Sequence, residues 1–180
     1  MNSAGIGQES WNREVNNLKS LKLPLPPEIQ LSVAEMFEAY AEACDSGHLQ
    51  KWHEFFTDDA IYRVTSRENY QAGLAHGDIY CEGLAMIRDR ADALLDSTVY
   101  EPRALRHLIS HPRIELLSEK RLAARTSFLV IEAMSDDEPQ IYMSGTYVDE
   151  LAVQDAQLKF SKRVCVYDNY RIRTSLVYPV

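Results

Sequence analysis

The chain has 180 residues, 46% hydrophobic and 26% charged, which indicates a globular domain with a sizeable core and excludes a disordered or fibrous protein. Its net charge of −8 gives an acidic surface, which disfavours nucleic acid and anionic membranes as partners. Three widely spaced cysteines make no disulfide framework, and neither a secretory signal nor a membrane-spanning run is present, so we expect a cytoplasmic protein.

Residues 1–27 have no sustained hydrophobic period and are expected to form an N-terminal arm that need not be fully ordered, followed by one domain over residues 28–180. Three helices are predicted at the front of this domain. The first begins at Glu28 and stops at Ser46–Gly47, and the second is a short helix around Trp52. The third has apolar residues at helical spacing from Tyr80 to Leu94.

Strand signals dominate the rest of the chain. A first strand is expected at 60–65, and four segments rich in β-branched and aromatic residues follow at 104–117, 121–133, 141–153 and 158–167. A last run, 171–178, is expected to continue the final strand after a bend. Helices at the front and consecutive strands behind them predict an α+β fold. We expect a strongly curved antiparallel sheet that wraps the three helices and leaves a cone-shaped cavity.

One cluster has the composition of a metal site. Asp45, His48 and His53, with Glu42 upstream, supply the two imidazoles and one carboxylate of non-haem Fe(II) centres. Gly47 interrupts the helix inside this cluster, however, and Trp52 marks the next helix as a core element. We therefore interpret His53 as a core or pocket histidine and expect no metal ligands on this chain.

His107 and His111 are four residues apart in a predicted strand, where four residues span about 13 Å. In that conformation they cannot bind the same ion. The sequence also lacks the phosphate-binding, dinucleotide-binding, nucleophile-elbow and zinc-protease motifs, and it has no Rieske cluster motif.

The cone could still carry acid–base chemistry, which needs a general base and a hydroxyl that stabilises developing charge. The candidates whose segments could face the cavity are Tyr40, His53, Tyr62, His107 and Tyr147. Tyrosines in an aromatic-rich sheet usually serve packing, so catalysis by this chain alone is the less favoured interpretation.

Basic residues gather in the strand half of the sequence. The predicted strand 158–167 is apolar or aromatic on both faces, although a sheet with one wet face should alternate more cleanly. A second covered face suggests that another subunit packs on the sheet, since arginine and tyrosine are typical of interface cores. A solvated basic face is the alternative.

Several stretches now match a known family in order. They are 52–62 (WHEFFTDDAIY), 102–107 (PRALRH), 144–149 (SGTYVD), and 162–168 (KRVCVYD) with 174–179 (TSLVYP). With them, the chain resembles the small (beta) subunits of the terminal oxygenase of aromatic-ring-hydroxylating dioxygenases, over residues 27–180. The resemblance implies the cystatin-like fold that ketosteroid isomerase and nuclear transport factor also have.

The resemblance further implies a structural, non-catalytic role in aromatic compound catabolism. The Rieske [2Fe-2S] cluster and mononuclear non-haem iron are expected on a large (alpha) partner subunit, with no cofactor on this chain. Three large and three small subunits are expected, the small ones associating as a trimer. The candidate interface residues are Arg103, Arg106, His107, Arg125, Lys162 and Arg163.

Two alternatives stay open at this point. The first is a stand-alone isomerase or dehydratase of the same fold with an acid–base pocket, for which the catalytic candidates are His53, Tyr62 and His107. The second is a module that binds a small ligand without turnover.

Overall fold

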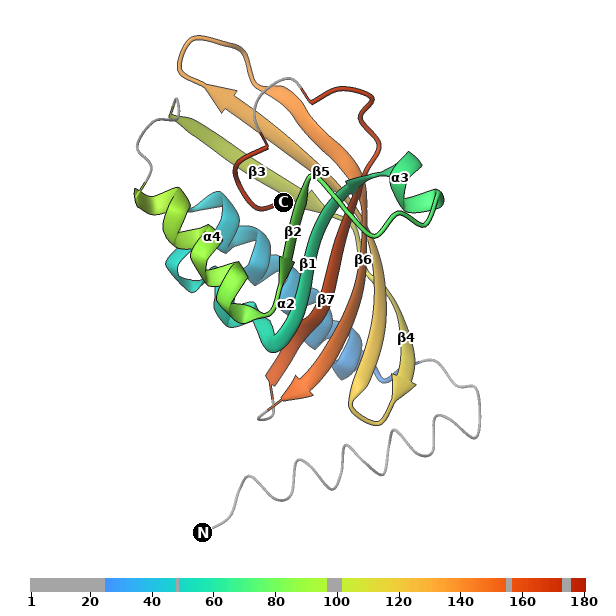
Figure 1. The fold of residues 1–180 in the computed structure, drawn as a ribbon. Helices are drawn as coiled ribbons and strands as arrows, with labels where there is room; N and C mark the ends of the chain where they lie inside the picture. The colour runs from blue at the N-terminus through green and yellow to red at the C-terminus, as the bar shows by residue number, and fades with distance from the viewer. Residues whose placement is uncertain (1–24, 48, 97–101, 155–156, 173–175) are drawn as a thin grey trace.

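The computed structural model describes residues 25–47, 49–96, 102–154, 157–172 and 176–180 (Figure 1). The arm expected at 1–27 therefore lies outside the described residues except for its last three. Helix α2 (Pro27–Asp45) starts with Pro27 in its first turn, where the missing N–H costs nothing. Its apolar stripe is buried as predicted: Ile29, Val33, Met36, Phe37, Tyr40 and Cys44.

The remaining helices differ in detail from the prediction. The short helix after Gly47 is a 3₁₀ helix, η1 (Leu49–Phe55), and a further one-turn helix, α3 (Arg67–Gln71), follows strand β1 (Phe56–Ser66). Helix α4 (Leu84–Asp96) begins later than expected, because Tyr80 belongs to strand β2 (Ile79–Glu82). Gly83, at φ 81°, separates the two elements in a left-handed conformation that favours glycine.

Seven strands are present in the described part of the chain. Besides β2 they are β1 (Phe56–Ser66), β3 (Arg103–Ile109), β4 (Arg113–Ser118), β5 (Arg121–Met134), β6 (Gln140–Gln154) and β7 (Gln157–Tyr167).

Two strand predictions were wrong. The segment expected as one strand at 104–117 is β3 and β4, separated at residues 110–112, and both pair with β5. Pro112 has no N–H for a sheet ladder, which explains the break. Of the strand expected at 171–178, residues 171–172 and 176–178 are not in a strand, and 173–175 lie outside the described residues.

The sheet is mixed rather than antiparallel as predicted. Its strand order is β2-β1-β7-β6-β5-β3, with β4 also on β5, and β7 runs parallel to β1 while pairing antiparallel with β6. The last strand in the sequence thus lies near the middle of the sheet. The α+β class and the strong curvature are as expected, and α2 and α4 lie against the same side of the curved sheet (Figure 1).

The core between helices and sheet is aromatic. Trp52 is packed edge-on against Phe56 and Tyr62, and Phe160 of β7 contacts Phe37 of α2 in the same way. Each of these side chains is at most 1% exposed. No helix among the described residues is long and apolar enough to span a membrane.

Candidate functional site

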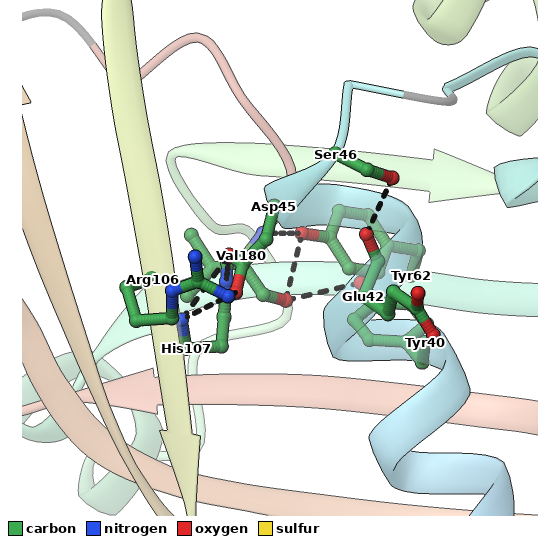
Figure 2. Close-up of polar contacts among 8 residues, drawn as sticks. All are labelled: Tyr40, Glu42, Asp45, Ser46, Tyr62, Arg106, His107 and Val180. Carbon is green, nitrogen blue, oxygen red and sulfur yellow. Dashed lines mark hydrogen bonds and ion pairs between the residues drawn. The ribbon is translucent and has the colours of Figure 1, made fainter.

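The segment 176–180 ends inside the curved sheet. Val180 is 1% exposed, and its main-chain oxygen accepts hydrogen bonds from the hydroxyls of Tyr40 (3.0 Å) and Tyr62 (3.5 Å) and from Cys165 Sγ (3.2 Å). Its N–H donates in turn to the Tyr62 hydroxyl oxygen at 2.9 Å. Figure 2 shows Tyr40 and Tyr62 directed at Val180. Side chains from α2, β1 and β7 therefore converge on one buried residue.

Two arginines hold the same segment nearer to the surface. Arg90 of α4 donates from Nη2 to the carbonyl oxygens of Val177 (2.9 Å) and Leu176 (3.4 Å). The guanidinium of Arg103 on β3 lies 5.8 Å from the ring centre of Tyr178. Residues 176–180 are thus fixed to both the helical side and the sheet.

A buried arginine lies beside this segment. Arg163 has no exposed surface, and its guanidinium lies 3.8 Å from the ring centre of Tyr147, 4.0 Å from that of Tyr40 and 4.3 Å from that of Phe160. Stacking of this kind stabilises a desolvated cation. Its Nη1 is 3.6 Å from Asp149 Oδ2, which is too long for a hydrogen bond but close enough for an ion pair.

Burial sets the protonation of this interior. It raises the pKa of Asp149 to about 7, even though Arg163 favours the charged carboxylate. Burial likewise raises the pKa of Cys44 and Cys165 to about 12 and that of Tyr40 and Tyr62 well above the usual value. These thiols and hydroxyls therefore stay protonated at neutral pH, where they act as hydrogen-bond donors and not as nucleophiles.

A second polar pair joins α2 to β3. The Asp45 carboxylate accepts from the main-chain N–H of His107 at 2.9 Å and lies 2.6 Å from its ring Nδ1 (Figure 2). Because a carboxylate only accepts, Nδ1 carries the proton, and Nε2 has no hydrogen-bond partner among the described residues. Arg106 Nη1 is 3.9 Å from the same carboxylate. Asp45 thus satisfies one main-chain N–H on the open edge of β3.

The cluster with the composition of a metal site, which the sequence pattern disfavoured as one, is not assembled among the described residues. Asp45 is engaged with His107, His53 lies half-buried on η1, and His48 lies outside the described residues. Among the residues that the structure describes, no group of three or more His, Cys, Asp or Glu side chains is placed to hold a metal ion.

The three predicted acid–base candidates, likewise, are not joined to one another by hydrogen bonds among the described residues. Tyr62 binds Val180 and His107 binds Asp45, while no hydrogen bond within the described part of the chain joins His53 to either.

The six predicted interface residues divide into two groups. Arg163 and His107 are buried within the domain, and Arg103 is mostly buried and ion-paired with Glu132 at 2.7 Å. Arg106 and Arg125 are exposed and Lys162 is partly exposed, the side chains of Arg106 and Lys162 at 73% and 44%. Only this second group lies where another chain can reach it.

The outer face of the sheet, opposite the helices, also carries an apolar patch. Leu108 and Ile141 are 51% and 60% exposed, and the strand register places Leu129 and Ile131 between them. We call these four residues the outer apolar patch. Contiguous exposed apolar side chains on one sheet face are typical of an interaction surface.

Sequence reasoning missed two features of the site. It identified Tyr40, Tyr62 and Tyr147 but not Val180, which the predicted strand at 171–178 had left outside the site. It considered Asp45 only as part of a metal cluster that it disfavoured, and it did not pair Asp45 with His107, 62 residues away. Neither the contacts of Val180 nor the pair of Asp45 and His107 can be read from the spacing of residues within one segment.

Comparison with known proteins is consistent across sequence and structure. Residues 28–164 match the SnoaL-like domain family. The chain is 32% identical to the terminal oxygenase component subunit beta 1 of terephthalate 1,2-dioxygenase from Comamonas, over 84% of this chain and 98% of that one. It is 28% identical to the small subunit of anthranilate 1,2-dioxygenase from Burkholderia cepacia, over 78% and 88%.

Two solved structures are similar to this chain and lead to the same family and fold. A chain from Novosphingobium aromaticivorans, described as the beta subunit of a proposed aromatic-ring-hydroxylating dioxygenase, superposes with a TM-score of 0.77 at 32% identity, covering 84% of this chain and 97% of that one. An NTF2-like protein with a cystatin-like fold from the same organism superposes at 0.59 with 15% identity, over 80% and 84%, and shows the shared fold alone. The predicted cystatin-like architecture is confirmed.

Proposed function

Because the chain belongs to the small, or beta, subunits of aromatic-ring dioxygenase terminal oxygenases, we propose that it is a non-catalytic structural subunit and that the reaction takes place on a large partner subunit. The observation that carries this is the span of the similarity, which reaches 84% of this chain and 98% of a beta subunit at 32% identity. A whole small subunit is matched, and not merely a fold shared by many enzymes.

The occupied interior supports a non-catalytic role. In enzymes that use a cavity for acid–base chemistry, the donors and the base must reach a substrate. Here the hydroxyls of Tyr40 and Tyr62 are bonded to Val180 of the same chain. As long as Val180 occupies the interior no substrate reaches these hydroxyls, and within the described residues no hydrogen bond joins the three acid–base candidates to one another, which argues against the stand-alone isomerase or dehydratase as the main activity.

The partner and the cofactors follow from the family. We propose that a large subunit carries the Rieske cluster and the mononuclear iron, and that three large and three small subunits form the oxygenase. The name of the terephthalate relative, a subunit of a terminal oxygenase component, supports a multi-subunit assembly. We place the complex in the cytoplasm, in keeping with three free and buried cysteines.

The substrate class is an aromatic acid. Terephthalate and anthranilate, which give two of the relatives their names, are both benzene carboxylates. We propose that the complex containing this chain hydroxylates a monocyclic aromatic carboxylate.

The outer apolar patch is the proposed contact surface. Arg106, which the register places opposite Ile131, lies at its rim, and Arg125 and Lys162 lie farther along strands β5 and β7. An apolar centre with charged groups at its rim is the usual composition of a protein interface. This choice keeps three of the six residues predicted from the sequence and assigns Arg103, His107 and Arg163 to the interior of the domain.

The test is affinity purification of the tagged chain from its own host grown on an aromatic acid, with iron and acid-labile sulfide measured in the eluate. Recovery of a larger partner together with iron and sulfide is expected. Recovery of this chain alone, under conditions in which the culture oxidises the aromatic acid, would contradict the proposal.

A further inference from the structure

We propose that the interior of the curved sheet is a binding site for a small apolar acid, and that Val180 occupies it in the structure as an intramolecular ligand. The occupant itself indicates what the site recognises. Val180 presents a branched apolar side chain and a main-chain oxygen, and it is 1% exposed. This inference goes beyond the proposed function, because it concerns a site on this chain that needs no partner subunit.

The site is built to bind an oxygen atom. Donors from Tyr40 on α2 and Tyr62 on β1 (Figure 2), and from Cys165 on β7, all reach the Val180 oxygen within 3.5 Å. Three donors on one buried acceptor form an arrangement that a carbonyl or carboxylate oxygen satisfies well. The surrounding aromatic rings supply apolar walls for the rest of a ligand.

The charge beside the site favours an acid. Arg163 is fully buried, and none of its Nε, Nη1 and Nη2 atoms has a hydrogen-bond acceptor among the described residues. Rings cover the guanidinium at 3.8 to 4.3 Å, and Asp149 at 3.6 Å is its ion-pair partner. Because the ion pair at 3.6 Å is too long for a hydrogen bond, it compensates the buried N–H groups less than a hydrogen-bonded anionic oxygen would. A carboxylate on an apolar body supplies both features.

Binding requires that the chain's own residue leave first. Val180 is held by the interior donors, whereas Val177 is held separately by Arg90 near the surface. The apparent affinity for an external ligand is then the intrinsic affinity multiplied by the fraction of molecules in which Val180 is released. Any substitution that destabilises the buried position of Val180 should therefore strengthen binding of an external acid.

The test uses the full chain and benzoate as the probe, with dissociation constants from isothermal titration calorimetry. Val180→Lys places an ammonium in the buried position and should release the segment, so that benzoate binds at least about tenfold more tightly than to the unmodified chain. The matched control is Tyr170→Lys, which adds the same charge at a residue that is 97% exposed and should leave the affinity unchanged.

The new ammonium could itself attract benzoate, so Val180→Gly is measured in parallel. It removes the apolar side chain without adding charge, and it also serves if the lysine variant does not fold. Adding Tyr40→Phe and Tyr62→Phe to either variant should abolish the gain.

A folded Val180→Gly chain that binds benzoate no more tightly than the unmodified chain would overturn the proposal. So would a gain in affinity that survives both tyrosine substitutions.

Discussion

Asp45 and His107 are 62 residues apart in the sequence, yet the Asp45 carboxylate accepts hydrogen bonds from both the main-chain N–H and the ring Nδ1 of His107. The pair joins the last turn of α2 to β3, which lies at the edge of the sheet. An edge strand presents unpaired N–H groups, and Asp45 satisfies the one that belongs to His107.

Replacing Asp45 should therefore destabilise the domain. Asp45→Ala leaves the main-chain N–H and the ring of His107 without their acceptor, and we expect a loss of about 2–3 kcal/mol in the free energy of unfolding. Urea denaturation followed by circular dichroism measures it. Asp58→Ala, at an exposed position, should change stability by less than about 0.5 kcal/mol. Equal effects of the two substitutions would contradict this role of Asp45.

Arg163 should be among the most sensitive positions. Arg163→Met removes the cation and leaves Asp149 buried without a counter-ion, which typically costs about 3–5 kcal/mol. The double variant Arg163→Met with Asp149→Leu removes both charges and should recover most of the loss. Denaturant melts of the single and double variants test this, and a double variant less stable than Arg163→Met would refute the reasoning.

Stability should also depend on the ionisation of Asp149. Its pKa is raised by burial to about 7 in the folded chain, whereas an unfolded aspartate titrates near 3.9. The folded state therefore binds more protons between these values, so the contribution of Asp149 to stability is greatest below about pH 4 and is lost as the pH rises through 7, by up to roughly 4 kcal/mol. Thermal melts from pH 4 to 8 should show a flatter profile for Asp149→Asn. If Asp149→Asn and the unmodified chain show the same dependence of stability on pH, Asp149 does not titrate in this range.

The outer apolar patch can be tested by one matched pair of substitutions. Ile141 on the patch and Leu31 on α2 are each 60% exposed. Ile141→Asp should reduce recovery of the large subunit in affinity purification by at least about tenfold, because a charge at an interface centre is left desolvated. Leu31→Asp should leave recovery unchanged. If the two variants recover equal amounts of partner, the contact surface lies elsewhere.

Gly145 should tolerate no side chain. A Cβ built on it would collide with the main-chain oxygen of Val166 on the neighbouring strand β7, so Gly145→Ala should cost more than about 2 kcal/mol. At Gly73 a Cβ meets nothing within 4 Å, and only the left-handed backbone opposes Gly73→Ala, at a cost of about 1 kcal/mol. Chemical denaturation distinguishes the two. If Gly145→Ala lowers the free energy of unfolding no more than Gly73→Ala does, β7 shifts enough to accommodate the added Cβ.

Local patterns predicted the elements of this fold well. The apolar stripe identified α2 and its buried face, and the content of β-branched and aromatic residues identified β5 and β6 as strands. The break at Pro112 was less visible, because His111 and Pro112 lie in a β-rich run whose apolar pattern continues on both sides.

Long-range relationships were not predictable in the same way. The parallel pairing of β1 with β7 joins Tyr62 to Arg163 in register, and nothing in either segment specifies that neighbour. The charge on Arg163 suggested a surface position, since arginine is rarely buried. The rings of Tyr40 and Tyr147, which come from two other elements, stabilise the buried guanidinium together with Phe160 and Asp149.

The position of β7 between β1 and β6 has a consequence for synthesis. The β1–β2 hairpin connects to the rest of the sheet only through a strand that leaves the ribosome after all the others. Until then, β1 and β6 each present an open edge, and the interior remains uncovered. The full sheet should therefore form largely after translation, and the unpaired edges of β1 and β6 are prone to aggregation in that interval.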